Sequence, residues 1–247
     1  METLLYQFAI SHYCEKARWA LDHKKVAYQI KNLLPGLHIL ALRGKVEDTS
    51  LPVLRINGKY IQGSDQIIDV LEQIITAYPL TPTNPMQRDD AQYWESFATT
   101  ELAAPYGVFY YSHMLEYPHL LRQRYSQNGP WYTPFFFALT FNRICQRLRE
   151  MYNITNSSAN QARERIEAAL QKLQQHLQSR TYLVGNQFSR ADLSVAALLS
   201  PLARPAQMAT YRSNVYPDVI NEFQAQFDGS SVMQWVRQIY QTHRNEQ

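Results

Sequence analysis

A proline-rich segment divides this 247-residue chain into two parts with different hydrophobic patterns. Residues 78–85 contain three prolines, which lack a backbone N–H and fix φ, so the segment favours a stiff connector over a helix. Before it, apolar residues form short runs of strand length, whereas beyond it they recur with a period near 3.6 residues. We therefore predict a mixed domain at residues 1–77, a linker at 78–86 and an all-helical domain at 87–247.

The first part of the chain carries the signals of a βαβ unit followed by a hairpin. Strand-like runs at residues 4–9 and 26–33 flank a segment with helical spacing at 12–23, which predicts two parallel strands joined by a right-handed crossover. Asn57-Gly58 then separates two further strand-like runs and predicts a hairpin, because both turn positions need positive φ. A helix is predicted over residues 65–76, with Ser64 as its N-cap.

One helix of the second part has a recognisable start. Ser189 and Asp192 stand three residues apart, so each side chain can accept a hydrogen bond from the backbone N–H of the other, which is a capping box. Phe188 and Leu193 are placed to form the hydrophobic contact that accompanies such a box. We predict an apolar, buried helix over residues 193–202.

Composition excludes several classes of protein. The chain is 45% hydrophobic and 18% charged, which is typical of an ordinary soluble globular protein and excludes a disordered one. Its 24 basic and 21 acidic residues are scattered along the sequence and give a net charge of +3, so nucleic acid is not expected as a partner. The longest apolar run near the C-terminus, residues 193–199, is far too short to span a bilayer, so a membrane is not expected either. Two cysteines are too few for a disulfide framework, and the start lacks the basic region of a signal peptide, so a cytoplasmic location is predicted.

Four motifs follow one another in an order that is typical of one family. Residues 11–21 (SHYCEKARWAL) resemble its first strand-to-helix turn, residues 51–54 (LPVL) its cis-proline segment, residues 63–67 (GSDQI) its γ-glutamyl-binding turn, and residues 182–193 (YLVGNQFSRADL) a motif of its helical domain. The family is that of the soluble glutathione transferases. The resemblance implies an α+β fold, with a thioredoxin-like N-terminal domain (βαβ-ββα) followed by an all-α C-terminal domain. It also implies a homodimer, glutathione as co-substrate, and no metal or permanently bound cofactor.

The resemblance places Ser11 at the sulfur of glutathione. A glutathione enzyme keeps this thiol ionised at neutral pH, although a free thiol titrates near 8.5. A hydroxyl between the first strand and the first helix can donate a hydrogen bond to the thiolate, and the helix N-terminus adds a favourable dipole, so both lower the thiol pKa. From the local sequence alone, Ser11 is better interpreted as the N-cap of that helix.

Cys14 has two interpretations. Its spacing with Ala17 and Leu21 puts it on the apolar face of the predicted helix, where a cysteine is a buried core residue. An exposed thiol in the first helical turn would instead gain nucleophilicity. Ser-His-Tyr-Cys also resembles the Cys-Pro-Tyr-Cys of glutaredoxins, but without the leading cysteine only a one-thiol exchange from Cys14 is possible.

The resemblance also implies which residues bind the glutathione tripeptide. The backbone of Leu51, before a cis Pro52, would pair with the cysteinyl amide. Ser64 and Asp65 open a helix whose free N–H groups suit the γ-glutamyl carboxylate. Gly63 stands where the family commonly has an acidic residue or glutamine for the γ-glutamyl ammonium; Asp65 either substitutes for it or complements the helix dipole. The glycyl carboxylate needs a cation, and the sequence does not choose among Lys25, His38, Arg43 and Lys45.

Aromatic residues at helical spacing follow in the second part, and they suit either a helix core or an apolar ligand pocket. The predicted second-substrate pocket consists of Tyr13, Tyr106, Phe109, Tyr110 and His113. Trp131, Tyr132 and the run of phenylalanines at 135–137 are placed to close its other side. Of the three adjacent phenylalanines at 135–137, at least one should point toward a partner, a ligand or another helix, because they cannot all face one core.

The function predicted from these residues is that of a glutathione transferase, a detoxification enzyme that conjugates glutathione thiolate to a small apolar electrophile. Ser11 is the predicted thiolate-stabilising residue. Two alternatives stay open: a glutathione-dependent thiol reductase that uses Cys14, and a non-catalytic binding protein for apolar ligands on the same fold.

Overall fold

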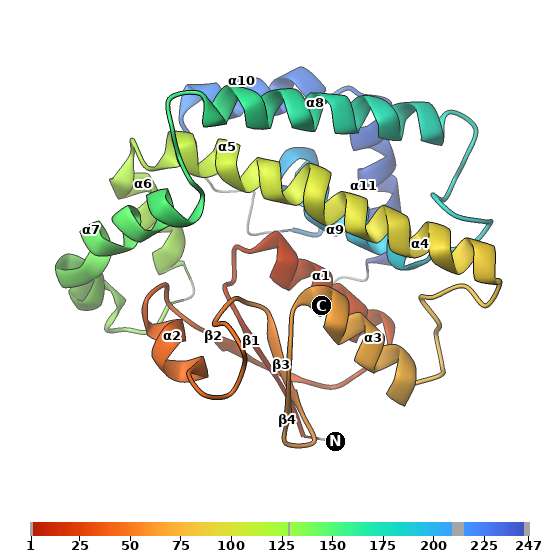
Figure 1. Ribbon diagram of the computed structural model, residues 1–247, viewed down its shortest axis with the longest axis horizontal. Coiled ribbons are helices and arrows are strands. Elements are labelled where there is room, and N and C mark those ends of the chain that lie inside the picture. The colour runs from red at the N-terminus through yellow and green to blue at the C-terminus, as the bar shows by residue number, and fades with distance from the viewer. Residues whose placement is uncertain (1, 128, 209–214, 245–247) are drawn as a thin grey trace.

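The computed structural model describes residues 2–127, 129–208 and 215–244 (Figure 1). Its first part contains a mixed sheet in the order β2-β1-β3-β4, formed by β1 (Thr3–Gln7), β2 (Gln29–Asn32), β3 (Val53–Ile56) and β4 (Lys59–Gln62). Helices α1 (His12–His23) and α3 (Ser64–Ile74) pack together above the sheet in Figure 1, between it and the helical domain. This is a thioredoxin-like domain followed by an all-helical one.

The strand pairing follows the pattern predicted from the sequence. β1 and β2 are parallel and are connected through α1, whereas β3 runs antiparallel to both β1 and β4. The hairpin turn between β3 and β4 has φ of 49° at Asn57 and 81° at Gly58, so the predicted Asn-Gly turn with two positive φ angles is confirmed.

The helical domain begins with a long rod. The rod consists of α4 (Pro85–Phe97), a π-helical segment η1 (Ala98–Ala103) and α5 (Ala104–Met114). Asn84 caps α4 by accepting a hydrogen bond from the backbone N–H of Gln87, and Pro85 occupies the first helical position, where its missing N–H costs nothing. The remaining helices are α6 (Pro118–Ser126), α7 (Thr133–Met151), α8 (Ser158–Leu177), α9 (Arg190–Ala203), α10 (Asp218–Phe227) and α11 (Ser231–His243).

Helix α9 is the centre of the molecule. Every one of its residues is buried, because it packs against α1 of the first domain and against α4 and α11 of the second. The predicted capping box is confirmed: the Asp192 carboxylate accepts from the backbone N–H of Ser189 at 2.9 Å, and the reverse bond to the Ser189 side chain is also present. Among the described residues, no helix is both long enough and apolar enough to cross a bilayer.

Two local features differ from the sequence-based prediction. Helix α2 (Leu37–Leu42) was not predicted; it packs on the opposite face of the sheet from α1, with Leu42 buried against Tyr6 and Val53. The N-cap of α3 is Gly63 and not Ser64, because φ at Gly63 is 89° and Ser64 already lies in the helix. Glycine adopts this left-handed conformation without steric cost.

Candidate functional site

Three segments with predicted site residues meet at one edge of the sheet. Because β1 and β3 are antiparallel, with Tyr6 opposite Val53, the turn after β1 that ends at Ser11 lies beside the segment that enters β3. The Leu51-Pro52 peptide bond is cis, as predicted. The Pro52 carbonyl accepts a hydrogen bond from the backbone N–H of Gly63 at 3.0 Å, which places the start of α3 at the same edge.

Ser11 is the N-cap of α1. Its Oγ accepts a hydrogen bond from the backbone N–H of Cys14 at 3.4 Å, and its own backbone N–H donates to the Phe8 carbonyl at 3.1 Å. The side chain is half-buried. A hydroxyl that accepts one bond still has its proton to donate, so capping the helix leaves Ser11 able to stabilise an anion at the same place.

Cys14 lies in the core of the first domain. Its side chain is fully buried, and this burial raises the pKa of its thiol above the usual value. The nearby Arg18 and the Ser11 hydroxyl act in the opposite direction but do not reverse the shift. The core interpretation of Cys14 fits this position, and a nucleophilic thiolate does not.

The turn at Gly63, Ser64 and Asp65 combines a buried hydroxyl with a partly exposed carboxylate. Ser64 is buried, and its Oγ lies 3.5 Å from Oδ1 of Asp65. The Asp65 side chain keeps 43% of its surface exposed, although its carboxylate is paired with Lys16 of α1. A Cβ at Gly63 would meet no atom within 4 Å, so the space in front of this turn is open.

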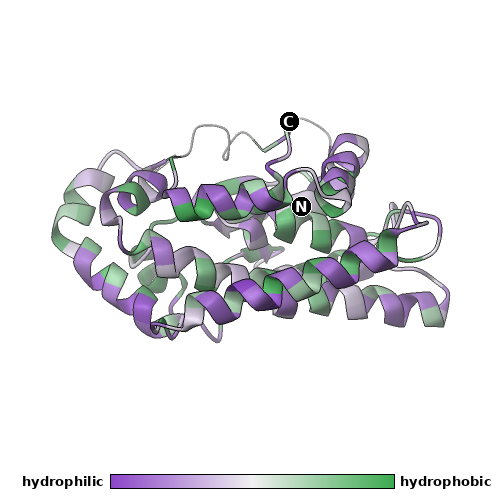
Figure 2. Cartoon of the chain, turned by 90° about the horizontal axis from the view of Figure 1, so that it is seen from above, coloured by the Kyte–Doolittle hydropathy of each residue, from purple (hydrophilic) through white to green (hydrophobic). Residues whose placement is uncertain are grey.

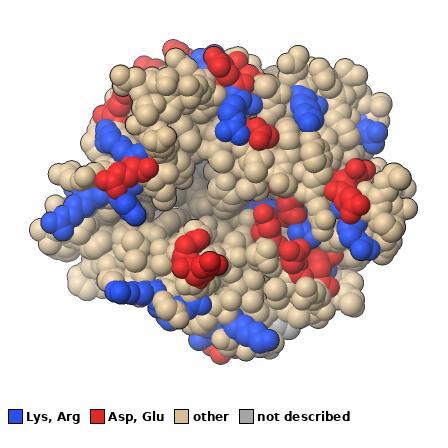
Figure 3. All heavy atoms as spheres, viewed as in Figure 1, with Lys and Arg blue, Asp and Glu red and all other residues tan. Residues whose placement is uncertain are grey.

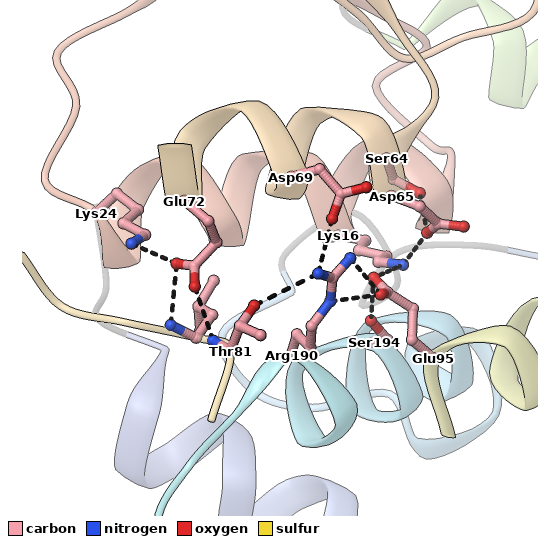
Figure 4. Close-up of polar contacts among 11 residues, drawn as sticks. Lys16, Lys24, Ser64, Asp65, Asp69, Glu72, Thr81, Glu95, Arg190 and Ser194 are labelled. Atoms are coloured by element: carbon pink, nitrogen blue, oxygen red, sulfur yellow. Dashed lines mark hydrogen bonds and ion pairs between the residues drawn. The ribbon is translucent and has the colours of Figure 1, made fainter. Parts of the chain in front are cut away.

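A buried ionic network behind this turn ties the two domains together (Figure 4). The Lys16 ammonium is fully buried and contacts Asp65 of α3 and, at 2.7 Å, Glu95 of α4. The second oxygen of Glu95 accepts from Arg190 of α9 at 2.5 Å, and Arg190 also pairs with Asp69 of α3 at 2.7 Å. Glu95 therefore joins a cation of the first domain to a cation of α9.

A second contact fixes the linker. Glu72 of α3 pairs with the buried Lys24, and its carboxylate accepts from the backbone N–H groups of Leu80 at 3.1 Å and Thr81 at 2.8 Å. Figure 4 shows this group beside the network of Glu95 and Arg190. The relative position of the two domains is thus set by charges, in addition to the apolar packing of α1 on α9.

The four candidate cations for the glycyl carboxylate lie in different places. Lys25 follows the far end of α1 and lies over the ring of Tyr78, away from Ser11.

His38 lies close to the site. Its ring is edge-on to the ring of Phe8, 5.0 Å between centroids, and is therefore beside the turn that leads to Ser11. Its Nδ1 accepts from the backbone N–H of Gly36, which leaves the Nε2 proton as a donor. The two others are exposed side chains at and after the end of α2, Arg43 and Lys45.

The predicted second-substrate residues divide into two groups. Tyr13 and Tyr106 come together on either side of His12, whose ring centroid is 4.7 Å from that of Tyr13 and 6.1 Å from that of Tyr106. Tyr110 stacks on Tyr106. Phe109 instead packs against Phe223 of α10, 4.4 Å between centroids, and also against His113. Phe109 therefore belongs to the packing of α5 on α10, and His113 packs beside it.

Trp131 is also placed differently from the prediction. It is 84% exposed and does not close a pocket. A small cavity beside Ser11 is lined instead by residues of the β1–α1 turn, of the segment after β2 and of α6, among them Phe8, Ile10, Leu34 and Tyr125. Figure 3 shows a hollow near the middle of this face of the molecule, where the loops of the first domain meet the helices of the second.

Sequence reasoning missed two sets of site residues. His12 borders the site, and its Nε2 has no hydrogen-bond partner among the described residues. Burial lowers the pKa of this imidazole to about 4, so the ring is neutral at pH 7.

The second set is the buried ionic network of Lys16, Glu95 and Arg190. It was missed because no local pattern links charged residues so far apart in the chain. Burial of Lys16 could have been suspected from its position among apolar residues of the predicted helix.

Comparison with known proteins defines the family. The model "Glutathione S-transferase, N-terminal domain" matches residues 5–77, and "Glutathione S-transferase, C-terminal domain" matches residues 133–213. Together these matches cover more than half of the chain. The chain belongs to the glutathione S-transferase family.

Relatives by sequence are distant. Glutathione S-transferase U22 of Arabidopsis thaliana is 30% identical over 107 residues, which are 42% of this chain and 49% of that protein. A probable glutathione S-transferase of Nicotiana tabacum is 28% identical over 110 residues, 44% of this chain and 49% of the relative. The chain thus matches about half the length of these curated relatives.

Solved structures extend the likeness in fold over almost the whole chain. A glutathione S-transferase of Methylobacterium radiotolerans, solved in complex with glutathione sulfonate, has a TM-score of 0.60 at 16% identity and covers 95% of this chain and 93% of its own. The beta-etherase LigF of Sphingobium sp. strain SYK-6 has a TM-score of 0.62 at 14% identity, with 96% and 99% covered. At these identities the likeness concerns the fold.

Proposed function

We propose that the chain is a glutathione transferase that joins the sulfur of glutathione to an apolar electrophile. The observation that carries this proposal is the convergence of Ser11, the cis Leu51-Pro52 segment and the Ser64 turn at one sheet edge, since these are the parts needed to bind the tripeptide and to ionise its thiol. Membership of the glutathione S-transferase family supports the same reaction class.

Each part of glutathione has a partner in this proposal. The Ser64 hydroxyl and the free N–H groups at the start of α3 bind the γ-glutamyl carboxylate. The exposed edge of Asp65 binds the γ-glutamyl ammonium in the open space in front of Gly63. The Leu51 backbone pairs with the cysteinyl amide, and the Nε2–H of His38 donates to the glycyl carboxylate.

The chemical step follows from the position of Ser11. The thiol of glutathione loses its proton to solvent, and the Ser11 hydroxyl donates a hydrogen bond to the resulting thiolate, which lowers the thiol pKa. The sulfur electron pair then forms a C–S bond with the electrophilic carbon, and the leaving group departs with the electron pair of the bond that breaks. Tyr13, Tyr106 and the neutral His12 ring form the apolar wall against which the electrophile binds.

Cys14 takes no part in this mechanism. A fully buried thiol with a raised pKa is a poor nucleophile, so the reductase alternative lacks its reactive group. Replacement of Cys14 by alanine should leave turnover within a few-fold of wild type, in contrast to replacement of Ser11.

The test separates the two roles of Ser11, the helix cap and the thiolate donor. Ser11→Ala removes both, whereas Ser11→Asp restores a capping oxygen but has no proton to donate to an anion. We expect the thiol pKa of bound glutathione to rise and turnover to fall about 100-fold to 1,000-fold in both variants, the usual effect of losing one charge-stabilising donor. Turnover restored by Ser11→Asp would show that only the cap matters and would refute the proposed role.

Calorimetric titration of glutathione into the wild-type protein comes first. Saturable binding at or below the millimolar range is expected. Absence of glutathione binding at several millimolar would refute the proposed transferase function and favour a non-catalytic protein that binds apolar ligands.

A further inference from the structure

One end of the molecule combines exposed apolar side chains with unpaired basic ones. It is formed by α2, α6, α7 and the turn before α7, and we call it the α2–α7 end. Helix α7 lies at the left-hand edge of Figure 1, and α2 starts against it, with Gly36 beside the side chains of Phe136 and Ile144. Neither the proposed glutathione site nor the packing of the core uses the outer surface of this end.

The apolar part of this end projects into solvent. Phe135 and Leu139 stand four residues apart on α7 and are 71% and 86% exposed, and Trp131, in the turn before the helix, is 84% exposed. Leu40 of α2 is 70% exposed. Of the fourteen large hydrophobic residues that are exposed among the described residues, eight lie within residues 26–46 and 117–149. Figure 2 shows green, hydrophobic segments at this left-hand end.

The same two stretches of chain contain no acidic residue. Residues 26–46 and 117–149 include eight Lys or Arg and no Asp or Glu, whereas the rest of the chain has 16 basic and 21 acidic residues. Six of the eight are exposed, namely Lys31, Arg43, Lys45, Arg143, Arg147 and Arg149. Arg147 pairs with Glu150 at the end of α7, but Arg43 and Arg143 have no ion-pair partner among the described residues.

The basic side chains border the apolar ones. Arg43 follows directly after α2, close in the chain to Leu40, and Arg143 lies one helical turn beyond Leu139 on α7. In the view of Figure 1, Figure 3 shows several groups of blue atoms at the left-hand end, where α7 and α2 lie, with red atoms next to some of them and uncharged surface between them. The fold therefore gathers charges that the sequence separates by a hundred residues.

We propose that the α2–α7 end binds the surface of an anionic membrane, with Trp131, Phe135 and Leu139 inserted among the headgroups and Arg43 and Arg143 on the lipid phosphates. Exposed Trp, Phe and Leu bordered by Arg are the composition of interfacial anchors, since the rings bury at the acyl boundary while the cations stay at the anionic surface. The basic residues do form a binding surface in three dimensions, although their scatter along the sequence predicted none.

Charge and shape favour a bilayer over another protein. A second copy docked through this face about a two-fold axis would bring the unpaired Arg43 and Arg143 of both chains together, which like-charge repulsion opposes. The apolar residues on α7 and its preceding turn project from the surface as knobs, with Trp131, Phe135 and Leu139 between 71% and 86% exposed. A soft and planar anionic surface accepts such knobs without a matching pocket.

The experiment uses the full chain and two kinds of vesicle, phosphatidylcholine alone and an equal mixture of phosphatidylcholine and phosphatidylglycerol. Sedimentation measures binding, and tryptophan emission reports insertion, because Trp131 is exposed while Trp19, Trp94 and Trp235 are buried. We expect binding to the anionic vesicles with a blue shift of the emission, loss of binding as salt is raised, and at least tenfold weaker binding to phosphatidylcholine.

Two pairs of variants separate the apolar and the electrostatic contributions. Arg43→Gln with Arg143→Gln should weaken binding roughly thirtyfold, about fivefold for each charge at an anionic surface. Phe135→Ser with Leu139→Ser should weaken it at least tenfold and abolish the blue shift. The matched control, Met86→Ser with Arg180→Gln, changes one exposed apolar and one exposed basic residue elsewhere and should bind as wild type does.

Glutathione affinity should be the same in all three pairs of variants, because the proposed site assigns the glycyl carboxylate to His38 and uses none of these residues, so this test is independent of the enzymatic one. Absence of binding to anionic vesicles would overturn the proposal. So would binding that survives both α2–α7 pairs of variants. A concentration-dependent dimer that Phe135→Ser with Leu139→Ser dissociates in light scattering, without vesicles, would replace the bilayer by a second copy.

Discussion

The buried carboxylate of Glu95 should be among the most sensitive positions for the stability of this protein. It contacts two cations, Lys16 at 2.7 Å and Arg190 at 2.5 Å, and all three side chains are almost fully buried. Glu95→Gln keeps the shape but removes the charge. Breaking a buried pair in this way costs about 3–5 kcal/mol, because an uncompensated charge stays in a medium of low polarity.

The stability lost in Glu95→Gln should lie near the lower limit of this range. Lys16 keeps Asp65 as a second carboxylate and Arg190 keeps Asp69, and both of these are about 40% exposed, so solvent can reach them when Glu95 is neutral. We therefore expect Glu95→Gln to lower the free energy of unfolding by about 3 kcal/mol. Against the 5–15 kcal/mol that is typical of native proteins, this is a large loss.

Urea unfolding at pH 7, followed by circular dichroism, measures the effect. The matched control is Glu101→Gln, which removes a similar charge from a surface pair, Glu101 with Arg165 at 3.1 Å, where both side chains are well exposed. The control should cost less than about 1 kcal/mol. Equal losses for the two variants would refute the argument that burial of the network, and not the mere presence of an ion pair, stabilises the domain contact.

Two further predictions concern the site. Gly63→Ala should lower the free energy of unfolding by about 1–2 kcal/mol, because φ of 89° is unfavourable for a residue with a Cβ even though that atom would meet nothing. The control is Gly229→Ala, which lies in equally open space without positive φ and should leave the stability unchanged. Equal shifts of the two variants in thermal unfolding would contradict this argument. For His12 the pKa is about 4 in the folded protein against an ordinary 6.5, so the stability that the neutral ring contributes above pH 6.5 is lost as pH falls through 4. His12→Gln should flatten this decline in free energy of unfolding between pH 7.5 and pH 4.5, and an unchanged decline would show that other groups cause it.

Local sequence signals predicted the parts of the fold that are determined by a few neighbouring residues. The bounds of α1 are as predicted, because its apolar spacing begins just after Ser11 and ends at His23. The Asn57-Gly58 hairpin and the capping box of α9 are equally local, since each depends on side chains within four residues of one another.

Helix α2 shows what local signals do not contain. It has six residues, it follows Gly36 with φ of 91°, and it has no side-chain cap. Short helices are marginal on their own, so the packing of Leu42 against strand residues Tyr6 and Val53 stabilises this one. Those partners lie in β1 and β3, and their proximity to α2 depends on the completed sheet.

The residues of the candidate site likewise fall into those that local sequence signals predicted and those that depend on tertiary contacts. Ser11, Pro52 and Ser64 were predicted because each occupies a motif, and the register of β1 and β3 then brings the motifs together. The network that fixes the helical domain on this site was missed, since Arg190 and Glu95 are 95 residues apart and no local pattern links them. Burial is what gives these charges their effect, and burial of a charged residue follows from tertiary contacts.

Charge distribution combines a signal that is present in the sequence with one that appears only in three dimensions. A net charge of +3 describes a nearly neutral protein, yet it is the sum of two acid-free stretches with eight basic residues and a remainder in which acidic residues outnumber basic ones by 21 to 16. The acidic excess lies outside these stretches and includes the carboxylates that neutralise Lys16 and Arg190 between the domains. Because most of the basic residues in the acid-free stretches stay exposed at the α2–α7 end, the field outside the molecule is asymmetric, and at low ionic strength this end should turn toward an anionic surface first.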